Sequence, residues 1–335
     1  MQHIQHIHTC KKFLDLRFDI VKQIRFFFWS KNFQEVDAPH IVHLPGQEPY
    51  LSPMSLNIHD EAGNAYHGFL HTSPEYTMKK MLAAGYERIF SLGTCYRDWE
   101  SFGGTHNPEF SMLEWYRTGV DFYKIMEDTE NLVAHIFKNI EWKNPKFNIQ
   151  EAWQRKTMQE IWKEYADIDL DDHLTNEAMF ELNGTRGYKP SEDESYEDLF
   201  YRFFLNEIEP KLKEQNLIIH HYPAQMASLA KLSDDDPRYA ERFEAYIDGV
   251  ELANAFTELT DADEQKRRLE NEQRQRQELG KGIFDIDKEF LDAVQNLPPC
   301  AGIALGVDRL VQALVGCQNI DDVLVLPASK LFKTE

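Results

Sequence analysis

The sequence predicts an α+β fold in which an antiparallel β-sheet is flanked by helices. Strand and helix segments are interleaved without a strict βαβ rhythm, and neighbouring strands are joined by short hairpins, which favours an antiparallel sheet over a doubly wound one. The 335 residues are 42% hydrophobic and 13% aromatic, which supports a sizeable core and argues against disorder. We expect residues 1–335 to form a single domain.

The N-terminal part predicts one helix followed by strands. Residues 13–29 carry apolar side chains at helical spacing and predict an amphipathic helix. Residues 33–36 predict a short strand, and residues 50–69 a β-rich stretch. The early histidines are interpreted as part of a frayed, solvated terminus rather than a metal site: His3, His6 and His8.

A helix and a hairpin follow. Ser73 resembles a helix cap, with Pro74 at the first helical position and Glu75 at the positive end of the helix dipole, and the helix is expected to end at Gly85. Residues 88–96 and 108–117 then predict the two strands of an antiparallel hairpin.

The second half is expected to start with helices. Residues 121–139 predict a long amphipathic helix, and residues 150–215 a more polar, mainly helical stretch with an acidic, solvated loop at 191–194. Residues 217–222 predict a strand, and residues 242–256 one or two more.

The C-terminal part is expected to close the core. Residues 263–279 predict a highly charged helix ended by Gly280, and residues 290–294 a short helix. In residues 302–314, a glycine-rich strand turns into a helix that carries Asp308 and Arg309.

The charge and the cysteines exclude several classes of protein. The net charge of −21 disfavours non-specific binding to nucleic acids or membranes, which needs a basic surface. No signal peptide and no run of 18 apolar residues is present, so we expect a soluble, cytoplasmic protein. The cysteines lie far apart without a CxxC motif and are interpreted as reduced thiols: Cys10, Cys95, Cys300 and Cys317.

Arg97 is the first candidate for chemistry. It stands where a strand meets a loop, and its planar guanidinium can bridge a carboxylate and a phosphate. The alternative is a surface salt bridge with Asp98 or Glu100. His106 and Asn107 follow in a turn and could contact a phosphate or a base, or could be turn residues only.

Glu251 and Glu258 form the second candidate group. They are seven residues apart, so one regular strand would place them on opposite faces, and a bulge near Ala255 is needed to bring them together. Two carboxylates suit a Mg²⁺ ion carried by substrate phosphates. The alternative is a solvated strand edge, but the apolar neighbours make partial burial the better interpretation.

Gly302, Gly306 and Arg309 form the third group. Small residues let a ligand lie flat against a strand, and Asp308 could orient Arg309 or cap the helix. The pattern alone is weak. Walker, dinucleotide-binding, HExxH and Gly-x-Ser-x-Gly motifs are absent from the sequence, and Cys95 is interpreted as a structural contact rather than a nucleophile.

Together these segments resemble class II aminoacyl-tRNA synthetases. Pro39 resembles the proline of the first motif, which builds the dimer interface in that class; residues 97–116 resemble the second motif and residues 302–310 the third. The resemblance implies the antiparallel catalytic core of that class and a homodimer. HNPEFSMLEWY and ELANAFTEL are similar to the lysyl subclass.

Within this subclass the chain resembles the elongation factor P–(R)-β-lysine ligase family. Lysyl-tRNA synthetases carry an anticodon-binding OB domain before the catalytic core, and a first-motif helix starting near residue 13 leaves no room for one. Ser73 and Ala304 stand where lysyl synthetases usually have alanine and glycine. The resemblance implies that larger side chains there favour a β-amino acid.

The resemblance implies an ATP-dependent enzyme that adenylates (R)-β-lysine and transfers it to a lysine of elongation factor P, without tRNA or a membrane. Arg97 is expected to bridge the attacking carboxylate and the α-phosphate, and Arg309 to hold the γ-phosphate.

The implied ATP-binding residues are Arg97, Glu100, Asn107, Glu251, Leu252, Gly306 and Arg309, with Arg97, Glu251 and Arg309 catalytic. The implied substrate-binding residues are Ser73, Pro74, Glu75, Tyr116, Glu258 and Ala304. Glu251 and Glu258 are expected to serve Mg²⁺ that arrives with ATP, and Glu258 also the substrate ammonium.

Two departures from the family pattern leave questions open. The loop after Arg97 is one residue longer than usual, so either Trp99 or Glu100 takes the nucleotide-contacting position. Ala255 replaces a glycine and either narrows the floor of the site or has no effect. The alternatives to a β-lysine ligase are an α-lysine or tRNA-charging enzyme, a non-catalytic synthetase-like module and, more distantly, an asparagine synthetase of the synthetase-like type.

Overall fold

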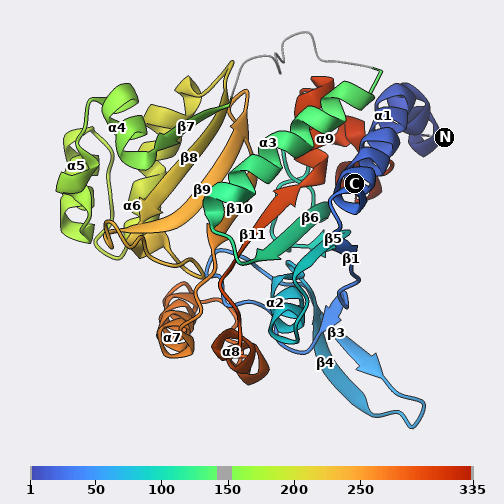
Figure 1. Ribbon diagram of the computed structural model, residues 1–335, viewed down its shortest axis with the longest axis horizontal. Helices are drawn as coiled ribbons and strands as arrows, with labels where there is room; N and C mark the ends of the chain where they lie inside the picture. The colour runs from blue at the N-terminus through green and yellow to red at the C-terminus, as the bar shows by residue number, and fades with distance from the viewer. Residues whose placement is uncertain (1, 142–152, 333–335) are drawn as a thin grey trace.

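The computed structural model describes residues 2–141 and 153–332. Its centre is an eight-stranded sheet (Figure 1). In spatial order its strands are β1 (Gln34–Glu35), β5 (Arg88–Tyr96), β6 (Glu109–Thr118), β11 (Cys300–Gly306), β10 (Val250–Thr257), β9 (Tyr239–Ile247), β8 (Asn216–Pro223) and β7 (Gln154–Thr157). The six central strands pair antiparallel, and the short edge strands β1 and β7 pair parallel to their neighbours. The predicted antiparallel α+β fold is confirmed.

Three helices cover one face of this sheet from β1 to β9 (Figure 1). They are α1 (Gln2–Ser30), α3 (Phe122–Asn139) and α9 (Val307–Val315). Their apolar sides and the inward residues of the central strands form the largest core, in which Trp115, Phe28 and Leu305 are fully buried. Burial of this apolar surface fixes which face of the sheet remains for a site.

Two smaller groups of helices lie beside the sheet. α4 (Met158–Ala166), α5 (Asn176–Thr185) and α6 (Tyr196–Phe203) pack around β7 and β8 in a second core rich in aromatic residues. α2 (Glu75–Ala83), α7 (Ala262–Glu278) and α8 (Lys288–Gln295) lie together near the ends of the central strands (Figure 1). A last helix, α10 (Ala328–Leu331), follows α9. Short 3₁₀ or π turns occupy Leu170–His173, Phe204–Ile208, Glu209–Lys211, Ala224–Met226 and Ile320–Val323.

A small second sheet projects from the body (Figure 1). It consists of β2 (Ile41–Val42), β4 (Ala65–Leu70) and β3 (Ser55–His59), and the β3–β4 hairpin forms the projection. The β-rich stretch predicted for residues 50–69 therefore begins only at Ser55 and continues to Leu70.

Several predicted elements are confirmed. The hairpin of β5 and β6 and the helix α3 lie where the sequence placed them, and Asp121 caps α3 by accepting hydrogen bonds from the backbone N–H groups of Tyr123 and Lys124. Residues 242–256 form two strands, and residues 153–215 are mainly helical, while residues 150–152 lie outside the described residues. All four cysteines are free thiols, and all but Cys317 are buried.

Two local predictions are wrong. The N-terminus is helical from Gln2, because the rings of His3 and His6 hydrogen-bond the backbone oxygens of Lys330 and Leu324 and so hold α1 against the C-terminal segment. The cap of α2 is Pro74 rather than Ser73, although Ser73 Oγ accepts a hydrogen bond from the Glu75 N–H at 3.0 Å.

Among the described residues, no helix is both long enough and apolar enough to cross a bilayer.

Candidate active site

Strand register decides which side chains share the open face of the sheet. One row of directly paired residues crosses four central strands: Glu114, Ala304, Asn254 and Glu244. The next row on the same face is Tyr116, Gly302, Phe256 and Arg242. Residues between these rows, such as Trp115, Ile303 and Ala255, point into the core on the opposite face. The predicted motifs on distant parts of the chain therefore meet on one surface.

A β-bulge brings Glu251 to this face. The pairing of β10 with β9 shifts between Glu251 and Ala253, so Leu252 is the extra residue. The predicted bulge near Ala255 is thus wrong in position: it lies beside the turn at Asp248 and Gly249, both with positive φ. Ala255 is fully buried in the core and does not form the floor of the site.

A cavity of about 220 Å³ lies where the second and third motifs meet. All seven residues predicted to bind the nucleotide line it: Arg97, Glu100, Asn107, Glu251, Leu252, Gly306 and Arg309. Ala304, assigned above to the amino-acid substrate, and Asn254 lie in the same wall. The structure brings the predicted nucleotide residues together.

Arg97 lines this cavity and makes no ion pair among the described residues. Its guanidinium stacks on the Phe110 ring, 5.0 Å from the ring centroid, and its Nε is buried without a hydrogen-bond partner among the described residues. The alternative of an ion pair with Asp98 or Glu100 is absent from the described contacts. A desolvated guanidinium without a counterion is a strong binding point for an anion.

Arg309 joins the third motif to the loop of the second. Its Nη2 lies 2.8 Å from His106 Nε2, and its Nη1 lies 3.5 Å from Glu251 Oε2. Burial, then the positive charge of Arg309, lowers the pKa of His106, so the imidazole stays neutral and can accept this hydrogen bond. Asp308 does not orient Arg309. It accepts hydrogen bonds from Arg17 on α1 and from the Ser111 N–H.

The loop of the second motif settles which side chain faces the cavity. Glu100 lines it, whereas Trp99 is 90% exposed and has a φ of 62°. Asn107 also lines the cavity, but its amide is engaged within the protein. Its Nδ2 donates to Glu109 O, and its Oδ1 accepts a hydrogen bond from the Ala328 N–H at 2.9 Å.

Buried carboxylates lie next to this cavity, around Tyr116. Ser73 Oγ donates to Glu114 Oε1 at 2.5 Å, and Tyr116 OH donates to Glu114 Oε2 at 3.1 Å. Gly302 is required here because an added Cβ would lie 2.2 Å from the Tyr116 ring. The glycine therefore makes room for a tyrosine rather than for a ligand.

Lys79 connects the other two carboxylates. Its Nζ lies 2.5 Å from Glu258 Oε2 and 2.7 Å from Glu75 Oε1, and the lysine is 1% exposed. Burial opposes its charge, but Glu258 and Glu75 outweigh burial and raise the pKa of Lys79. The network has more carboxyl groups than cations. Burial raises the pKa of Glu114 and of Glu258 to about 8.

The network around Tyr116 therefore contains more negative than positive groups. When ionised, Glu75, Glu114 and Glu258 carry three negative charges against the single positive charge of Lys79. A ligand with ammonium groups would relieve this imbalance.

The chain is similar in sequence to known proteins over nearly its whole length. The family model for tRNA synthetases class II (D, K and N) matches residues 4–330. An elongation factor P–(R)-β-lysine ligase of Hamiltonella defensa is 36% identical over 321 residues, 94% of each chain. Ligases with the same name from Proteus mirabilis and Yersinia enterocolitica are 38% and 36% identical over 92% and 93% of each chain.

This chain belongs to the elongation factor P–(R)-β-lysine ligase family of class II synthetases. The predicted family and fold are confirmed, and the match covers both cavity walls described above, from β5 to α9.

The structure does not bring together the two glutamates that the ligase-family resemblance assigned to magnesium. Glu251 lies in the nucleotide cavity, and Glu258 is paired with Lys79. Along the strand they are roughly 20 Å apart, far beyond the reach of one ion with ligands at about 2.1 Å. Of the two glutamates, Glu251 is the one that lines this cavity; burial raises its pKa, and the negative charge of Glu244 raises it further. One or two carboxylates suit an ion that arrives with phosphates.

Sequence reasoning missed three members of this ligase-family site. Glu114 lies two residues before Tyr116 on the same strand, so strand alternation could have revealed it. Lys79 lies four residues after Glu75, the spacing of a helical ion pair. Glu244, which accepts hydrogen bonds from Tyr222 and Tyr246, carried no local signal.

Proposed function

We propose that this chain is an ATP-dependent ligase that activates (R)-β-lysine as an acyl-adenylate and transfers it to a lysine side chain of elongation factor P. The observation that carries the proposal is the charge of the pocket around Tyr116. Its three carboxylates and single lysine leave an excess of two negative charges, which matches the two ammonium groups of a lysine isomer. The named relatives have the same activity in their names.

Adenylation needs positioning and charge neutralisation more than a protein nucleophile. An oxygen of the substrate carboxylate attacks the α-phosphorus, and pyrophosphate leaves with the electrons of the broken P–O bond. Arg97 would hold both the carboxylate and the α-phosphate, since its guanidinium makes no ion pair among the described residues and offers parallel N–H groups. Arg309 would bind the terminal phosphate on the other side of the cavity.

Glu251 would hold the Mg²⁺ ion that arrives with ATP. When bound, this ion neutralises phosphate charge as the bond to pyrophosphate breaks. Glu251 already lies 3.5 Å from Arg309, so the same carboxylate would orient the arginine that meets the phosphates.

Ser73 and Ala304 would adapt the pocket to a β-amino acid. The Ser73 hydroxyl, which an alanine would lack, holds one oxygen of Glu114. Ala304 is directly paired with Glu114 across the strands. An A304G substitution should therefore shift the preference in adenylation toward α-lysine, and an unchanged preference would remove the assigned role of this residue.

ATP–pyrophosphate exchange with (R)-β-lysine and with α-lysine tests the proposed function. Exchange should depend on β-lysine more than on α-lysine, and elongation factor P should then gain the mass of one β-lysyl group. Lack of exchange with either isomer would contradict adenylation. Exchange without modification of elongation factor P, but with charging of tRNA, would instead indicate the tRNA-charging alternative.

A further inference from the structure

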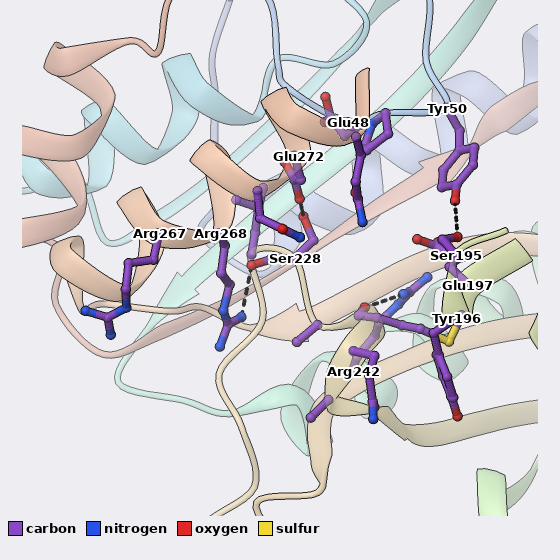
Figure 2. A pocket seen from close by; sticks show the side chains of 18 of the residues that line it. Glu48, Tyr50, Ser195, Tyr196, Glu197, Ser228, Arg242, Arg267, Arg268 and Glu272 are labelled. Carbon is purple, nitrogen blue, oxygen red and sulfur yellow. Dashed lines mark hydrogen bonds between the residues drawn. The ribbon is translucent and has the colours of Figure 1, made fainter. Parts of the chain in front are cut away.

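A second cavity lies beside the carboxylate pocket and is larger than one amino acid requires. Its volume is about 710 Å³, within the range of about 300–1,000 Å³ that holds drug-sized ligands. Glu75 and Phe256, which both lie next to Lys79, are among its lining residues, and other lining residues come from α7 and from the start of α6 (Figure 2). After a lysine isomer is bound, space for a second group remains.

This cavity adjoins the cavity where the acyl-adenylate would form. Asn254 lines both cavities, and Arg242 Nε donates a hydrogen bond to its side-chain oxygen at 2.9 Å. A chain that enters the larger cavity therefore approaches Asn254 from outside the smaller one.

Three of the four arginines that line the cavity are paired with a glutamate, and the fourth, Arg274, donates a hydrogen bond to Asn271. Arg242 lies 2.8 Å from Glu244, while Arg267 and Arg268 both bind Glu264. These arginines make no ion pair with Glu48 or Glu272 among the described residues. Because they are positively charged, the cavity as a whole does not attract every cation.

Glu48 and Glu272 line the wall without an ion pair among the described residues. Glu272 is 9% exposed and accepts one hydrogen bond, from Ser228 Oγ at 2.6 Å (Figure 2). Glu48 is partly buried, and its Oε2 is buried without a hydrogen-bond partner among the described residues. Arg276 is near enough to interact electrostatically with both carboxylates, but its guanidinium donates to backbone oxygens instead. Carboxylates that line a cavity without a direct ion pair can bind a cationic group.

The surrounding structure holds these carboxylates in place. Arg276 Nη1 donates to the backbone oxygens of Glu48 and Leu51 at 2.7 and 2.8 Å, and so fixes the segment that carries Glu48. Tyr50, from the same segment, hydrogen-bonds Ser195 at the start of α6 across the cavity (Figure 2). The subsite is therefore preorganised, which lowers the entropic cost of binding.

We propose that Glu48 and Glu272 form the binding subsite for the side-chain ammonium group of the acceptor lysine. This proposal rests on the proposed function, because only the second half-reaction uses such an amine. The occupant is one lysine side chain of the acceptor protein, long enough to enter through the larger cavity and reach the acyl carbon near Asn254.

The subsite can also accept the proton that the ammonium group of the acceptor lysine loses. The ammonium first loses a proton, and the amine nitrogen then bonds to the acyl carbon. The C–O bond to the phosphate breaks with its electrons on AMP, and the nitrogen releases a second proton as the amide forms. Burial, and then Glu48, Glu197 and Glu75, raise the pKa of Glu272 to about 8 against the hydrogen bond from Ser228. The raised pKa of Glu272 lies closer to the pKa of a lysine ammonium group, about 10.4, so proton transfer from the ammonium group to Glu272 is less unfavourable.

Single-turnover transfer from preformed adenylate tests the subsite. The wild-type enzyme, E48Q, E272Q and the double variant are loaded with β-lysyl-adenylate, freed of ATP and mixed with elongation factor P. The transfer rate of each variant should fall at least tenfold more than its rate of ATP–pyrophosphate exchange. E270Q, an exposed glutamate on the same helix that does not line this cavity, is the matched control and should transfer at the wild-type rate.

Small acceptors provide a second measurement. N-acetyl-lysine amide should accept the β-lysyl group from the wild-type enzyme and lose this ability in the variants, whereas N-acetyl-norleucine amide, which lacks the amine, should not compete. Equal falls of transfer and exchange, or a raised KM for β-lysine in exchange, would overturn the proposal and assign the glutamates to the first substrate. Absence of exchange in the wild-type enzyme would instead refute the proposed function.

Discussion

Arg97 and the buried carboxylates illustrate what single residues contribute. Arg97 lines the cavity between the second and third motifs and makes no ion pair among the described residues, while Glu258, expected at a metal, is bound to Lys79. Both are charged residues whose surroundings include other charged groups. Their roles differ because a buried charge takes the partner that the fold places next to it.

Replacing Arg97 by alanine should reduce ATP–pyrophosphate exchange by about 10²–10³-fold, the effect of removing a donor that binds the transition state. The fold should survive, because no ion pair of the described residues includes Arg97. Exchange kinetics and thermal unfolding measure the two effects. R88A, at the other end of β5 and exposed, serves as the control. Wild-type exchange in R97A would refute the assigned role.

The pH dependence of stability should report the excess of carboxyl groups around Tyr116. Burial raises the pKa of Glu114 and Glu258 to about 8, so the folded protein binds protons that the unfolded chain, with carboxyl pKa values near 4.3, has released. The free energy of unfolding of the ligand-free enzyme should therefore fall as the pH rises from about 5 to about 8.

A lysine isomer favours the ionised carboxylates, so its stabilising effect should grow over the same pH range. Thermal unfolding with and without the ligand, across pH, measures both trends. Norleucine, which lacks the side-chain ammonium, should show a smaller increase with pH than lysine. A ligand effect that is independent of pH would contradict this assignment of charge.

At the scale of elements, the ion pair of Arg17 and Asp308 connects α1 to α9. Asp308 is 2% exposed and also accepts a hydrogen bond from the Ser111 N–H of β6, so α1, β6 and α9 meet at one carboxylate. Burial raises the pKa of Asp308, and Arg17 opposes this rise. The pair therefore links the N-terminal helix to the nucleotide cavity.

An R17A substitution should lower the free energy of unfolding by about 3 kcal/mol, since it leaves a buried carboxylate without its cation. K22A on the same helix breaks an exposed pair with Asp19 and should cost less than about 1 kcal/mol. Urea denaturation compares the two variants. Equal, small losses would show that the buried pair contributes no more than the surface pair.

For the whole molecule, we expect a homodimer that uses α1. Phe18, Phe26 and Trp29 are 46%, 54% and 48% exposed and lie within one sector of this helix. Exposed aromatic residues grouped on one face are typical of protein interfaces.

A double substitution of Phe26 and Trp29 by aspartate should shift the protein from dimer to monomer, because it places charges within the apolar contact. Sedimentation velocity over a range of concentrations measures the shift. L205D, which alters an exposed leucine outside α1, should leave the assembly as it is. A monomeric wild-type protein, or a dimer that tolerates both aspartates, would rule out this interface.

The residues themselves determined the fold class, most strands and helices, and both arginines of the nucleotide cavity. These follow from local patterns: the alternation of β5 and β6, the cap of α3 at Asp121, and a cation placed after a strand. Only the tertiary structure decided the partner of Glu258, the position of the bulge at Leu252 and the placement of Glu48 and Glu272 in one cavity wall. The reason is physical. Periodicity and capping act within a few residues, whereas the partner of a buried charge is chosen among groups that the chain brings together from far apart.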